Sequence, residues 1–166
     1  GFTRSSTAPS IGAYEFNAFG VATRATLTTA AAGSASGSAF TTQPIISIKD
    51  TFGNIVTTST ASVTMTVSGN GTTVGTATVN AVNGIATFTN VGISGTSGTS
   101  YTLTFASSGL TSATQSITPV FSSNFFVTTT ANSGSGSLRE AITLANTTPG
   151  DDQISFNLTG ASAYTI

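Results

Sequence analysis

The stretch Ala61-Ser-Val-Thr-Met-Thr-Val67 decides the fold of this 166-residue chain. Its apolar side chains, Val63, Met65 and Val67, alternate strictly with one serine and two threonines. Because side chains two residues apart lie on the same face of a β-strand, this period of two predicts a half-buried strand with a threonine outer face. The strand is expected to end at a turn formed by Gly69-Asn70-Gly71.

Further along the chain, Asn83-Gly84 is the strongest short hairpin signal. A type I′ turn needs positive φ at both central residues, which asparagine tolerates and glycine adopts freely. We expect this turn to join strands over residues 76–82 and 85–89, with Phe88 facing the core.

Other short strands are expected before and after this region, over 25–29, 44–49, 101–106 and 115–118. Small residues fill 30–39 and predict a loop or an irregular strand. Short strands at intervals of about 8–12 residues are typical of a two-sheet sandwich.

The pattern changes after Phe121. A strand is expected over 124–130, and its adjacent Phe125 and Phe126 must face opposite sides. We expect one of them in the core and the other in the seam between the sandwich and the C-terminal block.

A helix is predicted over 138–146, because Ser137 and Glu140 form a capping box at its start. Its inward face is expected to hold Leu138, Ala141, Ile142 and Ala145. A strand over 153–158 should then turn Ile154, Phe156 and Leu158 inward, and a last short strand is expected over 164–166. Before the sandwich, residues 11–16 predict one more short strand.

Charged residues make up 5% of the chain, and the net charge is −1. Histidine and cysteine are absent, which excludes the usual zinc sites, Ser-His-Asp and Cys-His nucleophiles and thiol redox chemistry. Only four residues are basic, so nucleic acid and anionic membranes are not expected partners. Serine and threonine, about a third of the residues, supply the polar surface instead.

No apolar run is long enough to span a membrane. The chain starts with Gly-Phe-Thr-Arg and shows no signal peptide, so we expect it to be a segment of a longer protein.

The central block resembles the bacterial immunoglobulin-like repeats of large surface adhesins. The resemblance rests on Thr42-Gln-Pro-Ile-Ile-Ser-Ile-Lys-Asp50, Gly53-Asn54, Asn83-Gly-Ile-Ala-Thr-Phe-Thr89 and Tyr101-Thr-Leu-Thr-Phe105. These are mostly turn and core residues, so they indicate a fold and not a ligand.

The C-terminal block is similar to the start of a right-handed parallel β-helix that opens with a "SLREAI" helix. The matching segments are Val127-Thr-Thr-Thr-Ala131, Gly136-Ser-Leu-Arg-Glu-Ala-Ile142, Ala145-Asn146, Pro149-Gly-Asp-Asp152 and Ile154-Ser-Phe156. The resemblance implies that the helix caps the open end of the β-helix. Gly136 stands where many members of that family carry cysteine, so a disulfide there is not expected. The N-terminal Ile11-Gly-Ala-Tyr-Glu-Phe16 looks like the last coil of such a β-helix.

The expected fold is therefore all-β, an immunoglobulin-like β-sandwich flanked by fragments of parallel β-helix, with one short capping helix near 137–146. The expected units are the end of a preceding β-helix module with its linker (1–20), the sandwich (21–120), and the cap and first coil of a second β-helix (121–166).

Two pairs of residues are candidate calcium ligands, Asp50 with Asn54 and Asp151 with Asp152. Calcium takes six to eight oxygen ligands, whereas the chain has five carboxylates in total. We therefore favour turns in which these side chains bond nearby backbone, and expect no cofactor.

No catalytic residues are expected. A glycosidase pair of Glu15 and Glu140 would need two carboxylates about 5–10 Å apart, and Glu140 is already assigned to the helix cap. Lys49, the single lysine, could form an intramolecular isopeptide bond. Its alternation with Ile46 and Ile48 points it outward instead.

These observations favour a non-enzymatic structural spacer in a large repetitive bacterial cell-surface adhesin or extracellular filament, serving attachment or surface motility. Two alternatives stay open: a carbohydrate- or protein-binding module, and the connector of a β-helix enzyme acting on polysaccharide. The expected location is extracellular, at the bacterial cell surface. The expected partners are neighbouring repeats of the same chain, further copies in a filament, and a surface glycan or protein receptor.

Overall fold

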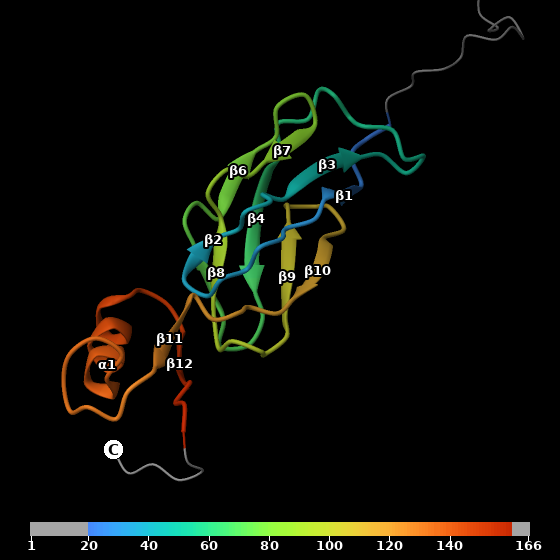
Figure 1. Ribbon diagram of the computed structural model, residues 1–166. Coiled ribbons are helices and arrows are strands. Elements are labelled where there is room, and N and C mark those ends of the chain that lie inside the picture. The colour runs from blue at the N-terminus through green and yellow to red at the C-terminus, as the bar shows by residue number, and fades with distance from the viewer. Residues whose placement is uncertain (1–19, 161–166) are drawn as a thin grey trace, which may run out of the picture.

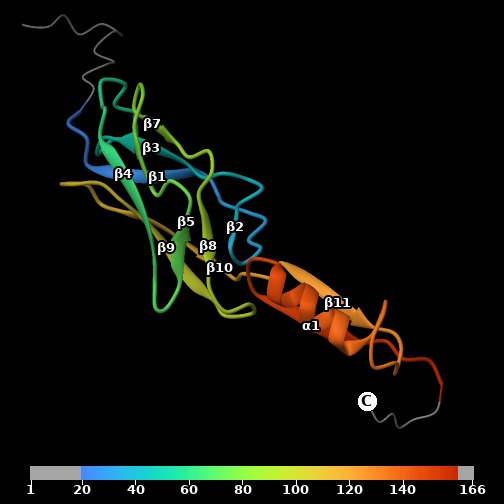
Figure 2. The same cartoon turned by 90° about the vertical axis from the view of Figure 1, so that its left-hand side faces the viewer.

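The computed structural model describes residues 20–160, which form an elongated, mostly β molecule with one helix (Figure 1). We call residues 20–120 the main body and residues 121–160 the C-terminal unit. Gly20 lies at one end of the long axis and the C-terminal unit at the other, as Figures 1 and 2 both show. The strand expected over 11–16 and the one over 164–166 lie outside the described residues.

The main body contains three antiparallel sheets. The largest has the order β10-β9-β4-β6, with β4 (Ser62–Val67), β6 (Thr78–Asn80), β9 (Tyr101–Ala106) and β10 (Ala113–Ile117). The second has the order β1-β3-β7, with β1 (Arg24–Thr29), β3 (Ile45–Lys49) and β7 (Ile85–Thr87). The third has the order β2-β8-β5, with β2 (Ser38–Ala39), β5 (Thr72–Val74) and β8 (Gly92–Ser94).

One hydrophobic core joins the three sheets. The alternation in β4 is confirmed, because Val63 and Met65 are buried while the threonines lie outward or half-buried. Phe88, just after β7, meets Phe105 of β9 edge to face, with ring centroids 5.8 Å apart. This contact ties two sheets together through side chains that are almost fully buried.

The first and last segments of the main body run side by side in the same direction. Arg24 pairs with Thr111 in a parallel bridge, and Ala35 pairs with Val120 in another. Between the bridges, the Gln115 side chain both donates to and accepts from the backbone of Ala31, at 2.7 and 2.9 Å. The chain therefore enters and leaves the main body along two hydrogen-bonded neighbours.

The turn at Asn83-Gly84 is confirmed, but the long hairpin expected around it is wrong. Asn83 and Gly84 have φ of 51° and 76°, and Val82 and Ile85 exchange two hydrogen bonds across the turn. Beyond that bridge the strands separate, because β6 pairs with β4 and β7 pairs with β3. The turn thus moves the chain from one sheet to another.

Three short strands, β2, β5 and β8, were not expected from the sequence. Each has two or three residues, too few to show an alternating pattern. A Cβ added to Gly92 would lie 2.0 Å from the Ser38 carbonyl oxygen, so β2 and β8 approach each other closely only because residue 92 is glycine.

The C-terminal unit consists of β11 (Ser123–Val127), α1 (Leu138–Thr147) and β12 (Asp152–Phe156). β11 and β12 form a two-stranded parallel sheet in which Phe125 pairs with Ile154. α1 contacts both strands and lies along β11 in Figure 2. No barrel or solenoid is formed among residues 20–160, and α1, their only helix, is too short to cross a membrane.

The inward face expected for this unit is only partly buried. Val127 and Ala141 are buried, but Ile142 is 45% exposed and Phe156 is 57% exposed. The expectation that Ile142 and Phe156 point into a core is therefore wrong for the described residues. Two strands are too narrow a sheet to cover the flank of the helix or the end of β12.

Candidate functional site

The predicted site residues lie at separate places in the fold. Asp50 and Asn54 follow β3 at the end of the main body near Gly20, whereas Asp151 and Asp152 lie where the C-terminal unit meets the main body. Among residues 20–160, no three acidic side chains gather as a metal-binding group. The two candidate calcium pairs therefore remain two separate pairs.

Asp50 is fully buried and organises a turn. One carboxylate oxygen accepts from the backbone amides of Phe52 and Asn54, both at 2.9 Å. The other accepts from the Gly20 amide at 3.1 Å and the Asn54 side-chain amide at 3.3 Å. All four contacts are N–H donors, so the carboxylate stabilises the backbone of this turn.

These contacts set the ionisation of Asp50. Burial raises the pKa of its carboxyl group, but the hydrogen bonds from Asn54, Gly20 and Phe52 outweigh burial and leave the pKa below its ordinary value. The ionised form is thus favoured in the folded protein.

We expect Asp50→Asn to destabilise the fold at neutral pH and to weaken its loss of stability in acid. The stabilisation by Asp50 is fully present above the ordinary value of 3.8 and is lost as pH falls through the lower folded pKa. The gap in unfolding free energy between wild type and Asp50→Asn should therefore narrow from about pH 5 to about pH 2 in urea titrations. A gap that stays constant over this range would contradict the role given to Asp50.

Asp151 connects the two parts of the molecule. Its Oδ2 accepts a 2.7 Å hydrogen bond from the Ser97 amide of the main body, and its carbonyl oxygen accepts from the Ser122 amide. Asp152 Oδ1 accepts from the Ser122 hydroxyl at 2.8 Å. The acidic pair expected at a solvated turn is therefore half-buried and holds the junction.

The backbone is closely packed at the same junction. Val120 and Ser36 are joined by a hydrogen bond from the Ser36 amide, and Val120 also donates to Ser34. Gly150 has a φ of 109°, and a Cβ added to it would lie 2.4 Å from the Ser36 carbonyl oxygen. Phe126, expected to fill this seam, is 53% exposed instead. Serine, glycine and aspartate therefore make the junction, and no aromatic residue fills it.

Two polar atoms near this junction are buried among the described residues and have no hydrogen-bond partner there: Ser97 Oγ and Asp152 Oδ2. The space beside them is a polar hollow that includes Ser36, Gly95 and Asp151 in its lining. The carboxylates of Asp151 and Asp152 each accept one hydrogen bond from a serine, so their contacts are those of a structural seam.

The helix cap is confirmed with one change. Ser137 is buried, and its hydroxyl accepts from the Glu140 amide at 3.2 Å. The Glu140 carboxylate accepts from the Gly136 amide at 2.6 Å, one residue before the expected partner. The Ser137 amide is already donated to the Gly134 carbonyl, so the glutamate engages the next free donor.

Comparisons with known proteins give no family assignment. No family model and no curated protein matches this chain. Seventeen chains among the solved structures match distantly. Two of them are structures of β-glucuronidase from Parabacteroides merdae, one with glycerol in its active site. Each is 17% identical, covers 58% of this chain and 12% of the enzyme chain, and has a TM-score of 0.44 or 0.43. The chain thus spans a small part of the length of that enzyme.

The other residues considered for chemistry stay apart in the described part of the chain. Glu140 is engaged in the helix cap, and Glu15 lies outside the described residues. Lys49 is half-buried on β3, and the neighbouring Asp50 carboxylate is already occupied by its amide donors. The contacts of these side chains are therefore those of caps and turns.

Proposed function

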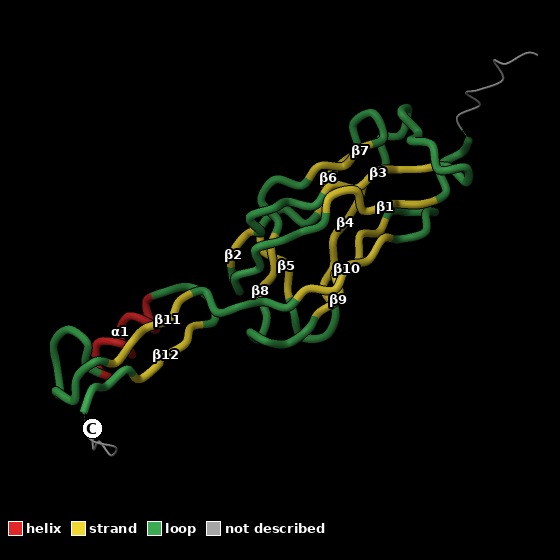
Figure 3. The backbone as a smooth tube through the Cα atoms, turned by 45° about the vertical axis from the view of Figure 1, so that its right-hand side comes forward, coloured by secondary structure: helices red, strands yellow, loops and turns green. Residues whose placement is uncertain are grey.

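We propose that this chain is a structural spacer in a large repetitive protein of the bacterial cell surface, either an adhesin or an extracellular filament. The observation that carries the proposal is the hydrogen-bonded junction between the main body and the C-terminal unit. The Ser97–Asp151 bond, the Ser36–Val120 bond and the close approach at Gly150 fix one unit against the other. An elongated molecule with such a junction holds its two ends at a set distance (Figure 3).

The finer fold assignment belongs to this proposal. The antiparallel sheets around one core support an immunoglobulin-like sandwich for the main body. The parallel β11–β12 pair with α1 against it supports the start of a parallel β-helix. The order of these elements also agrees with the order of the two sequence resemblances along the chain.

The aromatic residues favour a spacer over a carbohydrate-binding module. In the described part of the main body, Phe40, Phe88, Tyr101 and Phe105 are buried, and only Phe52 is exposed. Carbohydrate sites are commonly lined by aromatic side chains, and a single exposed ring is not such a lining. The connector of a β-helix enzyme is the other alternative, and it shares the same spacer geometry.

A spacer of this composition should keep its length and stability in any salt. Its few charges leave little for ions to screen, and its stability comes from the apolar core and the backbone ladders. We expect the maximum dimension in small-angle X-ray scattering and the Tm to change little between about 0.02 and 1 M NaCl. A broad, flexible distribution of sizes, or a Tm that falls steeply with salt, would contradict the proposal.

The cell-surface location rests on the composition, with abundant threonine and serine and no cysteine. Antibodies against the chain should label intact cells of the organism that produces it. Labelling that appears only after the cells are lysed would contradict this location.

A further inference from the structure

The C-terminal unit presents an unpaired sheet edge. β12 pairs with β11 on one side, and no described strand lies on its other side. The free edge of a strand exposes backbone N–H and C=O groups that can pair with another strand. A two-stranded sheet is also too small to be stable without further cover.

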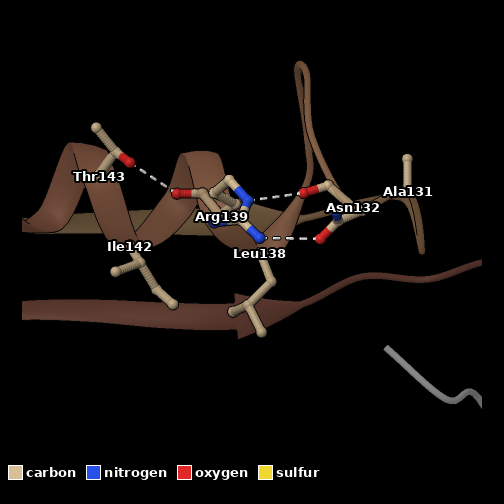
Figure 4. A pocket seen from close by; sticks show the side chains of 6 residues that line it. All are labelled: Ala131, Asn132, Leu138, Arg139, Ile142 and Thr143. Atoms are coloured by element: carbon tan, nitrogen blue, oxygen red, sulfur yellow. Dashed lines mark hydrogen bonds between the residues drawn. The ribbon is translucent and has the colours of Figure 1, made fainter.

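An apolar flank of the helix accompanies this edge. Figure 4 shows Leu138 and Ile142 pointing from α1 toward the strand drawn below it, β12. They line a groove of about 420 Å³ together with Ala131, Asn132, Arg139 and Thr143. Ile142 is 45% exposed and Phe156, at the end of β12, is 57% exposed. A strand added to β12 would cover both side chains.

The groove also carries a cation without a carboxylate partner among the described residues. The Arg139 guanidinium donates only to Asn132, to its carbonyl oxygen and its side-chain oxygen, both at 3.0 Å. The carboxylates of Asp50, Glu140, Asp151 and Asp152 accept from other groups. An incoming strand with an acidic residue near Arg139 would complement this charge.

We propose that residues 11–16 of a second copy of this chain add to the free edge of β12 as a parallel strand. This inference rests on the proposed spacer function and names the partner of the spacer. In Ile11-Gly-Ala-Tyr-Glu-Phe16, alternation places Ile11, Ala13 and Glu15 on one face. That face packs on the flank of α1, with Ala13 against Ile142 and Glu15 beside Arg139.

The parallel direction follows from the order of the elements. β12 begins at the main body, where Asp151 bonds Ser97, and runs away from it. α1 runs the opposite way, because its start is held next to the end of β11 by the Thr128–Gly136 hydrogen bond. Arg139 therefore lies near the far end of β12. Only a parallel strand brings Glu15, near the end of its own segment, to that place.

The strand must come from another copy. Four residue steps of at most about 3.6 Å keep Phe16 within about 14 Å of Gly20. Gly20 is bonded to Asp50 at the opposite end of the molecule from the C-terminal unit (Figure 1). The main body, whose six-residue strands are each about 20 Å long, lies between them.

Such pairing joins the tail of one copy to the head of the next. Head-to-tail contacts between different surfaces form open filaments when the rotation between copies does not close a ring. The second copy then continues the long axis of the first, since Phe16 lies at the far end of β12.

Sedimentation velocity of the full chain at increasing concentration tests this pairing. We expect dimers and longer species in the wild type, and about tenfold weaker association in Glu15→Arg and in Arg139→Glu. The double variant Glu15→Arg/Arg139→Glu should recover the wild-type association, because the charge pair is restored with opposite signs. Thr66→Glu, on the exposed face of β4, is the control for an added negative charge and should associate like wild type.

Three results would overturn the proposal. The first is a chain that stays monomeric at all concentrations, and the second is a double variant that associates as weakly as the single ones. The third is association that ignores Glu15→Arg but changes when residues 161–166 are removed, which would assign the edge of β12 to the chain's own tail. A monomeric chain of fixed length in scattering would still support the spacer function, so the two proposals fail separately.

Discussion

Phe105→Ala is expected to lower the free energy of unfolding by about 3–5 kcal/mol. Phe105 is fully buried on β9, and its ring meets Phe88 edge to face at 5.8 Å. Truncation removes the transfer free energy of the ring and leaves a cavity where two sheets meet. Few domains of this size have much more stability than this to lose.

Phe52→Ala is the matched control, since it removes the same atoms from a side chain that is 80% exposed. It should change the unfolding free energy by less than about 0.5 kcal/mol. Urea titrations followed by far-UV circular dichroism measure both variants. Equal effects at the two positions would mean that the Phe88–Phe105 contact does not join the sheets as described.

Gly150→Val is expected to open the junction between the main body and the C-terminal unit. At a φ of 109° a side chain is strained, and its Cβ would lie 2.4 Å from the Ser36 carbonyl oxygen and 2.6 Å from Ser122 Oγ. Both neighbours belong to the seam, so relief of this contact must move one unit away from the other. The Ser97–Asp151 hydrogen bond should break with it.

Gly134→Val separates this contact from backbone strain alone. Gly134 has a φ of 90°, and a Cβ added there meets no atom within 4 Å. Both variants share a strain of about 1–2 kcal/mol, but only Gly150→Val should speed hydrogen exchange at the Ser97 amide and broaden the scattering profile. Unchanged exchange at Ser97 in Gly150→Val would show that the seam does not depend on glycine at this position.

The strands of the main body were predictable where the alternation was long. β4 and β9 have six residues each, enough to show a period of two, and their inward residues are buried as expected. β2, β5 and β8 carry no such signal, because two or three residues cannot establish a period. The turn at Asn83-Gly84 was predictable from local conformation, whereas the partners of β6 and β7 depend on distant strands.

The residues of the candidate sites were identified by type, but their partners were not. Asp50 and Asp151 were recognised as acidic residues near turns, and both accept backbone amides. The Asp151–Ser97 contact spans 54 residues, and no local pattern reports a contact of that range. The same holds for Gly150 and Ser36, whose close approach becomes visible only when the two units are placed together.

The pairing of the first and last segments of the main body sets how the molecule carries tension. A pull on residue 20 and residue 120 acts along neighbours that are bonded at Arg24–Thr111, Ala31–Gln115 and Ala35–Val120. Because both run in the same direction and are pulled from opposite ends, these bonds are loaded in shear and resist together rather than opening one after another. The segment that transmits the load is also the segment that closes the fold, so the main body cannot lengthen until that shared set of bonds yields.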